Sequence, residues 1–134
     1  MAGFGPSFVT AVDLDGDDDV DLAVASGTPS VSVLANHGDG TFAEPVSFAA
    51  GAGHFYPDSL PAADLDGDQD LDLAVANHDS GNVSVLRNQG GMLFAAPENY
   101  IIGQYTRSVT AGDLDGDGDI DLAAGSRSPT AVSV

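Results

Sequence analysis

One acidic string occurs three times in this chain and constrains its fold more than any other feature. The copies span residues 13–22, 64–73 and 113–122, and each has aspartate at positions 1, 3, 5, 7 and 9 with glycine at position 4. Their first residues, Asp13, Asp64 and Asp113, are 51 and 49 residues apart. A string that recurs at this interval indicates a repeat fold, in which each unit buries its apolar face against its neighbours.

The segments between the acidic strings have the pattern of β-strands. Small and β-branched residues alternate with period two, and Gly, Asn and Pro interrupt them, whereas helical spacing is not sustained over ten residues. The expected strands are 7–12, 20–25, 31–33 and 41–49 in the first unit, 59–63, 71–76, 83–85 and 93–101 in the second, and 107–111, 120–124 and 131–134 in the third. Four antiparallel strands per unit predict the blade of a β-propeller. A β-helix has a far shorter period, and a β-sandwich would not repeat the acidic loop.

The chain is therefore expected to be an all-β partial propeller of roughly 2.7 blades. Blade 1 is predicted at residues 1–52, blade 2 at 53–102 and an incomplete blade 3 at 103–134. Val134 matches Val85 in the repeat, so residues 86–101 have no counterpart in the third unit. Because propellers close with four to eight blades, we expect a fragment of a longer protein, or else several copies that assemble into a ring.

Charge and composition exclude several classes of partner. The net charge is −18, and sixteen of the 21 acidic residues lie in the three strings, opposed by three arginines. Such a chain cannot neutralise phosphates, so nucleic acid and anionic membranes are poor partners. No apolar run approaches the roughly 20 residues of a membrane span, and the absence of cysteine excludes thiolate metal sites.

The acidic string has the chemistry of a site for a hard dication. Calcium takes six to eight oxygen ligands, which a tight loop supplies from alternating carboxylates and a backbone carbonyl, and the glycine permits the positive φ that such a loop needs. Without a cation, neighbouring carboxylates 4 Å apart repel one another by up to about 4 kcal/mol per pair at an effective dielectric near 20. Magnesium fits less well, because five acids exceed what its octahedral shell takes from protein.

Two other metal sites are excluded by their ligand patterns. An EF-hand needs glutamate at position 12 of its loop, but the residues there are Val24, Val75 and Ala124. Zinc is not supported, because the histidines lie outside the strings and share no ligand spacing: His37, His54 and His78.

The string Asp-x-Asp-Gly-Asp-x-x-x-Asp-Leu, followed by Ala-Val-Ala, Val-Ser-Val-Leu and then Asn-His-Gly-Asp-Gly-Thr-Phe-Ala-Glu-Pro-Val at residues 36–46, closely resembles the FG-GAP/VCBS repeat family. Such repeats form calcium-binding blades in integrin α-subunit heads, in secreted bacterial proteins and in some fungal lectins. The Gly-Ala-Pro of the family name is replaced here, for example by Ala25-Ser-Gly, which places the chain nearer the bacterial type.

The resemblance implies one calcium ion per string, or about three per chain. Positions 1, 3, 5 and 9 would bind through side chains: Asp13, Asp15, Asp17 and Asp21; Asp64, Asp66, Asp68 and Asp72; Asp113, Asp115, Asp117 and Asp121. Position 7 would bind through its backbone carbonyl: Asp19, Asp70 and Asp119.

The function expected from this resemblance is a non-enzymatic module of a secreted or cell-surface protein. Its calcium sites would be structural, and its partners proteins or glycans in adhesion, further blades of a parent chain, or other copies that meet through open sheet edges. One alternative is a catalytic or accessory fragment of a propeller hydrolase or lyase, whose candidate residues do not repeat in register: His54, Tyr56, His78, Asp79 and Glu98. Another alternative is an architectural spacer.

Overall fold

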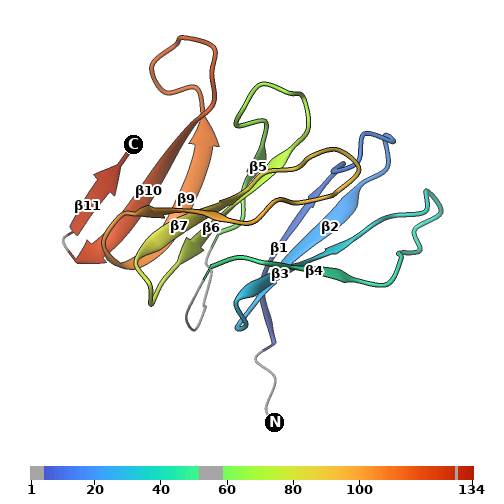
Figure 1. Ribbon diagram of the computed structural model, residues 1–134, viewed down its shortest axis with the longest axis horizontal. Coiled ribbons are helices and arrows are strands. Elements are labelled where there is room, and N and C mark those ends of the chain that lie inside the picture. Colours follow the sequence, from blue (N-terminus) through green and yellow to red (C-terminus); the bar gives the residue numbers. More distant parts are fainter. Residues whose placement is uncertain (1–4, 52–58, 129) are drawn as a thin grey trace.

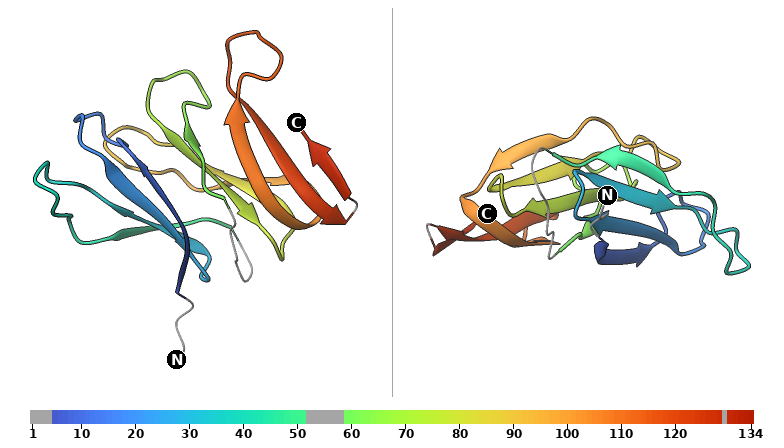
Figure 2. Two further views of the ribbon diagram at one scale, coloured as in Figure 1. Left: turned by 180° about the vertical axis from the view of Figure 1, so that it is seen from behind. Right: turned by 90° about the horizontal axis from the view of Figure 1, so that it is seen from below.

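The computed structural model describes residues 5–51, 59–128 and 130–134, and its regular elements are all strands. In these ranges there is no helix that could cross a membrane. The strands form three antiparallel sheets with the orders β1-β2-β3-β4, β5-β6-β7-β8 and β11-β10-β9. The sheets stand side by side like the ribs of a fan (Figures 1 and 2). This arrangement confirms the predicted all-β fold of partial propeller blades.

Each sheet is built from consecutive segments of the chain. The first contains β1 (Pro6–Val12), β2 (Asp21–Ser26), β3 (Ser30–Leu34) and β4 (Val46–Ala49). The second contains β5 (Ala62–Ala63), β6 (Asp72–Asn77), β7 (Asn82–Leu86) and β8 (Glu98–Ile101). The third contains β9 (Gln104–Gly112), β10 (Asp121–Ser128) and β11 (Thr130–Ser133). Residues 52–58 lie outside the described ranges, so the blade boundary expected at 52/53 stays a prediction.

The fourth strands are shorter than the sequence pattern indicates. Regular pairing begins only at Val46 in the first sheet and at Glu98 in the second, not at residues 41 and 93. The preceding residues contribute single bridges, Asn36 to Phe42 and Asn88 to Phe94. Pro45 and Pro97 lie between bridge and strand, and proline has no N–H to donate to a ladder. The first strand of the second sheet is also shorter than predicted, whereas β10 runs four residues beyond its expected end at 124.

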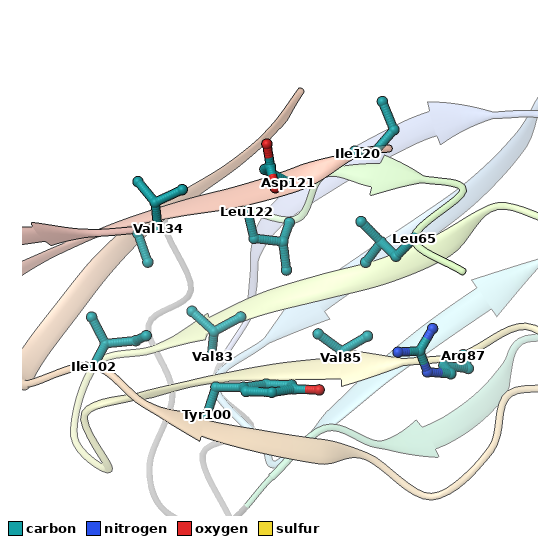
Figure 3. A pocket seen from close by; sticks show the side chains of 11 residues that line it. Leu65, Val83, Val85, Arg87, Tyr100, Ile102, Ile120, Asp121, Leu122 and Val134 are labelled. Atoms are coloured by element: carbon teal, nitrogen blue, oxygen red, sulfur yellow. The ribbon is translucent and has the colours of Figure 1, made fainter. Parts of the chain in front are cut away.

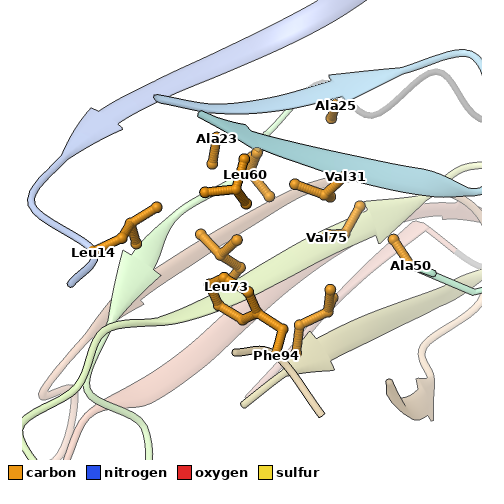
Figure 4. Close-up of a cluster of buried hydrophobic side chains, with 11 residues drawn as sticks. Leu14, Ala23, Ala25, Val31, Ala50, Leu60, Leu73, Val75 and Phe94 are labelled. Carbon is orange, nitrogen blue, oxygen red and sulfur yellow. The ribbon is translucent and has the colours of Figure 1, made fainter. Parts of the chain in front are cut away.

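The main core lies between the first and second sheets (Figure 4). Strand β2 buries every second residue, which is the alternation expected for a sheet with one covered face. Phe94 reaches across from the second sheet, and its ring meets that of Phe48 edge to face with the centroids 5.1 Å apart. The core residues are Leu14, Ala23, Ala25, Val31, Val33 and Ala50 on one side and Leu60, Leu73, Val75, Leu86 and Phe94 on the other.

The second sheet is covered on both faces. All six residues of β6 are buried, with Leu73 and Val75 in the core against the first sheet. Ala74 and Ala76 belong to a second core, which contains Val109 and Ala124 from the third sheet. Alanine at these positions allows neighbouring sheets to approach closely, which explains why an alanine-rich sequence forms strands here despite its helical propensity.

Candidate metal centre

The three acidic strings form the loops of the β1–β2, β5–β6 and β9–β10 hairpins. In both views of the chain from front and back, the three loops project from the same side of the molecule (Figures 1 and 2). In the first hairpin, β1 ends at Val12 and β2 begins at Asp21, so the loop spans residues 13–20, and the other two hairpins repeat this arrangement. The repeat of the sequence is therefore also a repeat of the site.

The aspartate at position 1 organises each loop through both of its carboxylate oxygens. Oδ1 of Asp13 accepts a hydrogen bond from the N–H of Gly16 at 2.8 Å, and Oδ2 accepts one from the N–H of Asp18 at 2.9 Å. The second and third loops repeat both bonds at 2.7–3.1 Å, through Asp64 and Asp113. Burial by itself raises the pKa of Asp13, but these backbone donors outweigh it and the pKa lies below its ordinary value.

Two positions in each loop adopt left-handed backbone conformations. Position 4 is glycine in all three loops, with φ between 80° and 83°, as the sequence predicted. Position 6 is also left-handed, which we did not predict: φ is 71° at Asp18, 76° at Gln69 and 98° at Gly118. The glycine at 118 was the available sequence signal, because it is the residue that adopts this conformation at no steric cost.

The aspartate at position 9 connects the loop to the sheet. Oδ2 of Asp72 accepts a hydrogen bond from the N–H of Leu65 at 3.2 Å, and Oδ1 accepts one from Asn88 at 2.8 Å. Asp21 repeats both contacts in the first hairpin, and the side chains of Asp21 and Asp72 are completely buried. Desolvation raises the pKa of Asp72 despite these donors. Within the described residues, Asp121 has only the contact to Oδ2, from Leu114 at 3.0 Å.

Acidic oxygens converge in each loop closely enough to hold a metal ion. One oxygen from each of three aspartates lies within 4.8 Å of the others, in the sets Asp13, Asp15 and Asp17; Asp64, Asp66 and Asp68; and Asp113, Asp115 and Asp121. In the first loop, Oδ1 of Asp15 is buried without a hydrogen-bond partner. Desolvation, together with the charges of Asp21 and Asp17, raises the pKa of Asp15. An oxygen-only donor set with an unsatisfied buried acceptor fits a hard cation.

The remaining predicted ligands lie in the loops or at the first residue of the strand that follows, and outside these three sets. They are Asp21, Asp72 and Asp117, predicted to bind through side chains, and Asp19, Asp70 and Asp119, predicted to bind through carbonyls. The N–H of each position-7 residue donates to the carboxylate at position 5, as from Asp19 to Asp17 at 2.9 Å. The full ligand assignment stays a prediction.

A cationic side chain that the sequence analysis missed lies beside the second loop. Nη1 of Arg87 lies 3.1 Å from Oδ2 of Asp66 and 3.8 Å from Oδ2 of Asp72, and its Nε lies 3.6 Å from Oε1 of Glu98. The repeat offset of 52 places Ala35 at the matching position in the first unit. The signal was therefore a break in the repeat, an arginine where the first unit has alanine.

The residues considered for catalysis are only partly described. Nδ1 of His78 lies 2.7 Å from Oδ1 of Asp79, and the His78 ring lies against Tyr105 with the centroids 5.1 Å apart. Glu98 accepts a hydrogen bond from the hydroxyl of Tyr100 at 2.9 Å. His54 and Tyr56 lie outside the described residues. Two cavities lie beside the second sheet among the described residues, and neither His78 nor Asp79 lines them.

The sequence matches the model of one known family, the FG-GAP-like repeat. This model matches at two places, residues 13–75 and 64–124, so each matched range runs from one acidic loop into the next repeat. Together the two matches cover most of the chain. No curated protein matches the sequence.

Proposed function

The chain belongs to the family of FG-GAP-like repeat proteins, and from this membership we propose that it is a calcium-binding β-propeller module of a secreted or cell-surface protein. The observation that carries the calcium proposal is that the same hydrogen-bonded loop occurs three times, each time with a cluster of acidic oxygens from three aspartates. Carboxylates held this close repel one another, and a bound dication relieves that repulsion.

The metal in this proposal has a structural role. Positions 1, 3, 5 and 9 of each loop supply carboxylate oxygens and position 7 a carbonyl, so the ion joins the two strands of a hairpin. Calcium is favoured over magnesium because it accepts more oxygen ligands in a flexible geometry. Because the ion binds the folded hairpin and not the unfolded chain, each site adds about 2.7 kcal/mol of stability when the free calcium concentration is a hundred times the dissociation constant.

The wider role that we propose is binding of a protein or glycan, as in adhesion, rather than catalysis. Support comes from the architecture, because the three acidic loops project from the same side of the array (Figure 1). The test is binding to arrays of glycans and extracellular proteins in calcium and in chelator. If the chain binds no ligand in either condition, the result would favour the alternative of an architectural spacer. If it converts a glycan into a product, the result would favour the alternative of an enzyme.

Titration calorimetry tests the metal sites directly. We expect one calcium ion per loop, or three per chain, with dissociation constants of roughly 10⁻⁴–10⁻³ M, the range of extracellular modules, and much weaker binding of magnesium. Fewer than two calcium sites, or equal affinity for the two ions, would contradict the proposal.

Thermal unfolding of matched variants tests which residues bind. Asp66→Ala removes a member of the second oxygen cluster, whereas Asp79→Ala removes a carboxylate outside the loops. We expect calcium to raise the melting temperature of Asp79→Ala as much as that of the unmodified chain, and that of Asp66→Ala by less. Identical calcium responses of the two variants would refute the assignment.

A further inference from the structure

A groove with a volume of about 180 Å³ lies between the first and second sheets. One wall belongs to β3, β4 and the segment between them, and the other wall belongs to the segment just before Phe94. Most of this surface is apolar. An apolar cavity of roughly 150 Å³ holds a benzene molecule, so this groove has room for one aromatic ring. The lining residues that matter here are Ala35, Glu44, Val46 and Phe48 on one wall and Met92 and Leu93 on the other.

Three positions of the first wall are polar in the second unit. With the repeat offset of 52, the matched pairs are Ala35 and Arg87, Val46 and Glu98, and Phe48 and Tyr100. In the second sheet, Oε1 of Glu98 lies 3.6 Å from Nε of Arg87, and the Glu98 carboxylate accepts a hydrogen bond from Tyr100. Figure 3 shows Arg87 and Tyr100 on the wall of the cavity beside the third sheet. The blade fold therefore accepts polar side chains at these positions, and the apolar surface is particular to the first unit.

The second wall differs between the units in the same direction. Met92 and Leu93 occupy the positions of Gly40 and Thr41 in the first unit. Leu93 remains mostly exposed, and Val46 on the opposite wall is 56% exposed. Single exposed apolar residues are common on protein surfaces, but apolar residues that gather around one groove indicate an interaction site.

The strand beside the groove has an open edge. Strand β4 is the edge strand of the first sheet, and no described residue pairs with its outer side. The residues of β4 are uncharged, whereas the matching strand β8 begins with Glu98. Charged side chains on an edge strand discourage the addition of another strand, and β4 has none. An extended segment that pairs with β4 would direct every second side chain toward the second sheet and the groove.

Charge indicates which kind of segment fits. The chain has a net charge of −18. Glu44, at the groove, is exposed and forms no ion pair within the described residues, whereas Glu98 in the second unit lies beside Arg87. A lysine or arginine of a partner is therefore attracted both by the chain as a whole and by Glu44.

We propose that this groove and the outer edge of β4 bind an extended, basic segment of a protein partner. The segment pairs with β4 as an added strand and inserts an aromatic side chain between Val46 and Leu93. A lysine or arginine two residues away lies on the same face of the added strand and contacts Glu44. This assignment rests on the protein-binding role proposed above and names the chemistry of the partner, and it requires no calcium.

A synthetic peptide of this chemistry tests the groove. The peptide is acetyl-Thr-Lys-Thr-Phe-Thr-Lys-Thr-amide, in which a lysine on each side of phenylalanine allows either strand direction. It is titrated into the full chain in calcium at physiological salt and followed by nuclear magnetic resonance. We expect the Met92 methyl resonance and the β4 amide resonances to shift. Replacing the phenylalanine of the peptide with alanine should weaken binding at least tenfold, because the burial of the ring is lost.

Matched variants of the chain locate the binding site. Val46→Glu introduces the residue found at the matching position of the second unit and should weaken binding at least tenfold. Val9→Glu is the control, because Val9 is 55% exposed on β1, at the opposite edge of the same sheet, and the variant changes the net charge equally. It should leave the affinity unchanged. Leu93→Ala should also weaken binding, and because Leu93 is mostly exposed this variant keeps the fold.

Several results would overturn the proposal. They include no resonance shift at millimolar peptide, equal binding of the two peptides, and equal affinity of Val46→Glu and Val9→Glu for the phenylalanine peptide. Binding of N-acetylphenylalanine amide as tightly as the peptide would make the groove a site for small molecules. A dimer in sedimentation that Leu93→Ala abolishes would make a second copy of the chain the occupant.

Two comparisons separate this proposal from the function proposed above. If the chain binds the peptide in chelator but no calcium in calorimetry, the groove stands and the calcium proposal fails. If Val46→Glu still binds the ligand that the unmodified chain binds on glycan and protein arrays, the binding role stands and the groove is rejected.

Discussion

Replacing Arg87 with alanine should make the second acidic loop bind calcium more tightly. The Arg87 guanidinium lies within 3.1 Å of Asp66, one of the three clustered acids, and so neutralises part of the charge that would attract an ion. The first loop has Ala35 at the matching position and contains no such competitor there. The first and second loops are therefore alike in sequence but not in electrostatics.

The size of this effect follows from Coulomb's law. The repulsion between a single positive charge and a divalent cation 4 Å away is about 2 kcal/mol in water. At an effective dielectric near 20 this repulsion is several times larger. The side chains of Arg87 and Asp66 are 30% and 33% exposed, so the arginine can turn toward solvent and the lower value applies. An exposed ion pair is itself worth at most about 1 kcal/mol. We expect a gain of about 1–2 kcal/mol, or roughly 5- to 30-fold in affinity.

Nuclear magnetic resonance can assign this gain to one loop. The amide resonances of Gly16, Gly67 and Gly116 each report on a separate site, because each N–H donates to the position-1 aspartate of its own loop. Calcium titration of Arg87→Ala should shift the midpoint for Gly67 and leave that for Gly16 unchanged.

Two further variants separate charge from shape. Arg87→Lys keeps the positive charge and should retain the weak second site, and Ala35→Arg should weaken the first site by a comparable factor. If Arg87→Ala leaves the second site unchanged or weakens it, the arginine supports the calcium ligands rather than competing with the ion, and the electrostatic reasoning is wrong.

Three other predictions concern packing, backbone and titration. Phe94→Ala should lower the free energy of unfolding by about 3–5 kcal/mol in denaturant titration, whereas Leu93→Ala, whose side chain is 65% exposed, should change it by at most about 0.5 kcal/mol. Gln69→Gly should raise stability by up to about 1 kcal/mol because φ is 76° there, and Gln69→Ala should not. Tyr100 donates to Glu98, which raises the phenol pKa above 10.0, so the stability from this contact is present below pH 10 and is lost as the phenol ionises. Glu98→Gln should lower that pKa in an ultraviolet absorbance titration.

Much of the fold could be predicted because its determinants are local and repeated. Alternation in Val31-Ser-Val33 and Val83-Ser-Val85 corresponds to β3 and β7, and the acidic strings mark the hairpin loops between β1 and β2 and their counterparts. The fourth strands were predicted too long because the prediction used the hydrophobic pattern alone. That pattern does not take into account that Pro45 and Pro97 have no N–H to donate to the strand ladder.

The parts of the site that escaped prediction depend on contacts between segments distant in sequence. The string identified the aspartate at position 9 as a ligand candidate, but its hydrogen bond to Asn88 depends on how the third strand ends beside the loop. The contact of Arg87 with Asp66 likewise depends on the fold, because Arg87 lies 21 positions after Asp66 in the sequence. The repeat pattern of the sequence identifies the residues that the units share. It does not predict the contacts of the residues that differ between units.

The side chain of Asn88 has a mechanical consequence for the array. Its amide donates to the carbonyl of Leu14 at 2.8 Å, so the second sheet holds the start of the first acidic loop. An ion that rigidifies this loop therefore also stiffens the junction between two neighbouring sheets. In a chain pulled from its ends, we expect the force needed to separate these sheets to rise with the calcium concentration of the surroundings. The array would then be compliant where calcium is scarce and rigid where it is abundant.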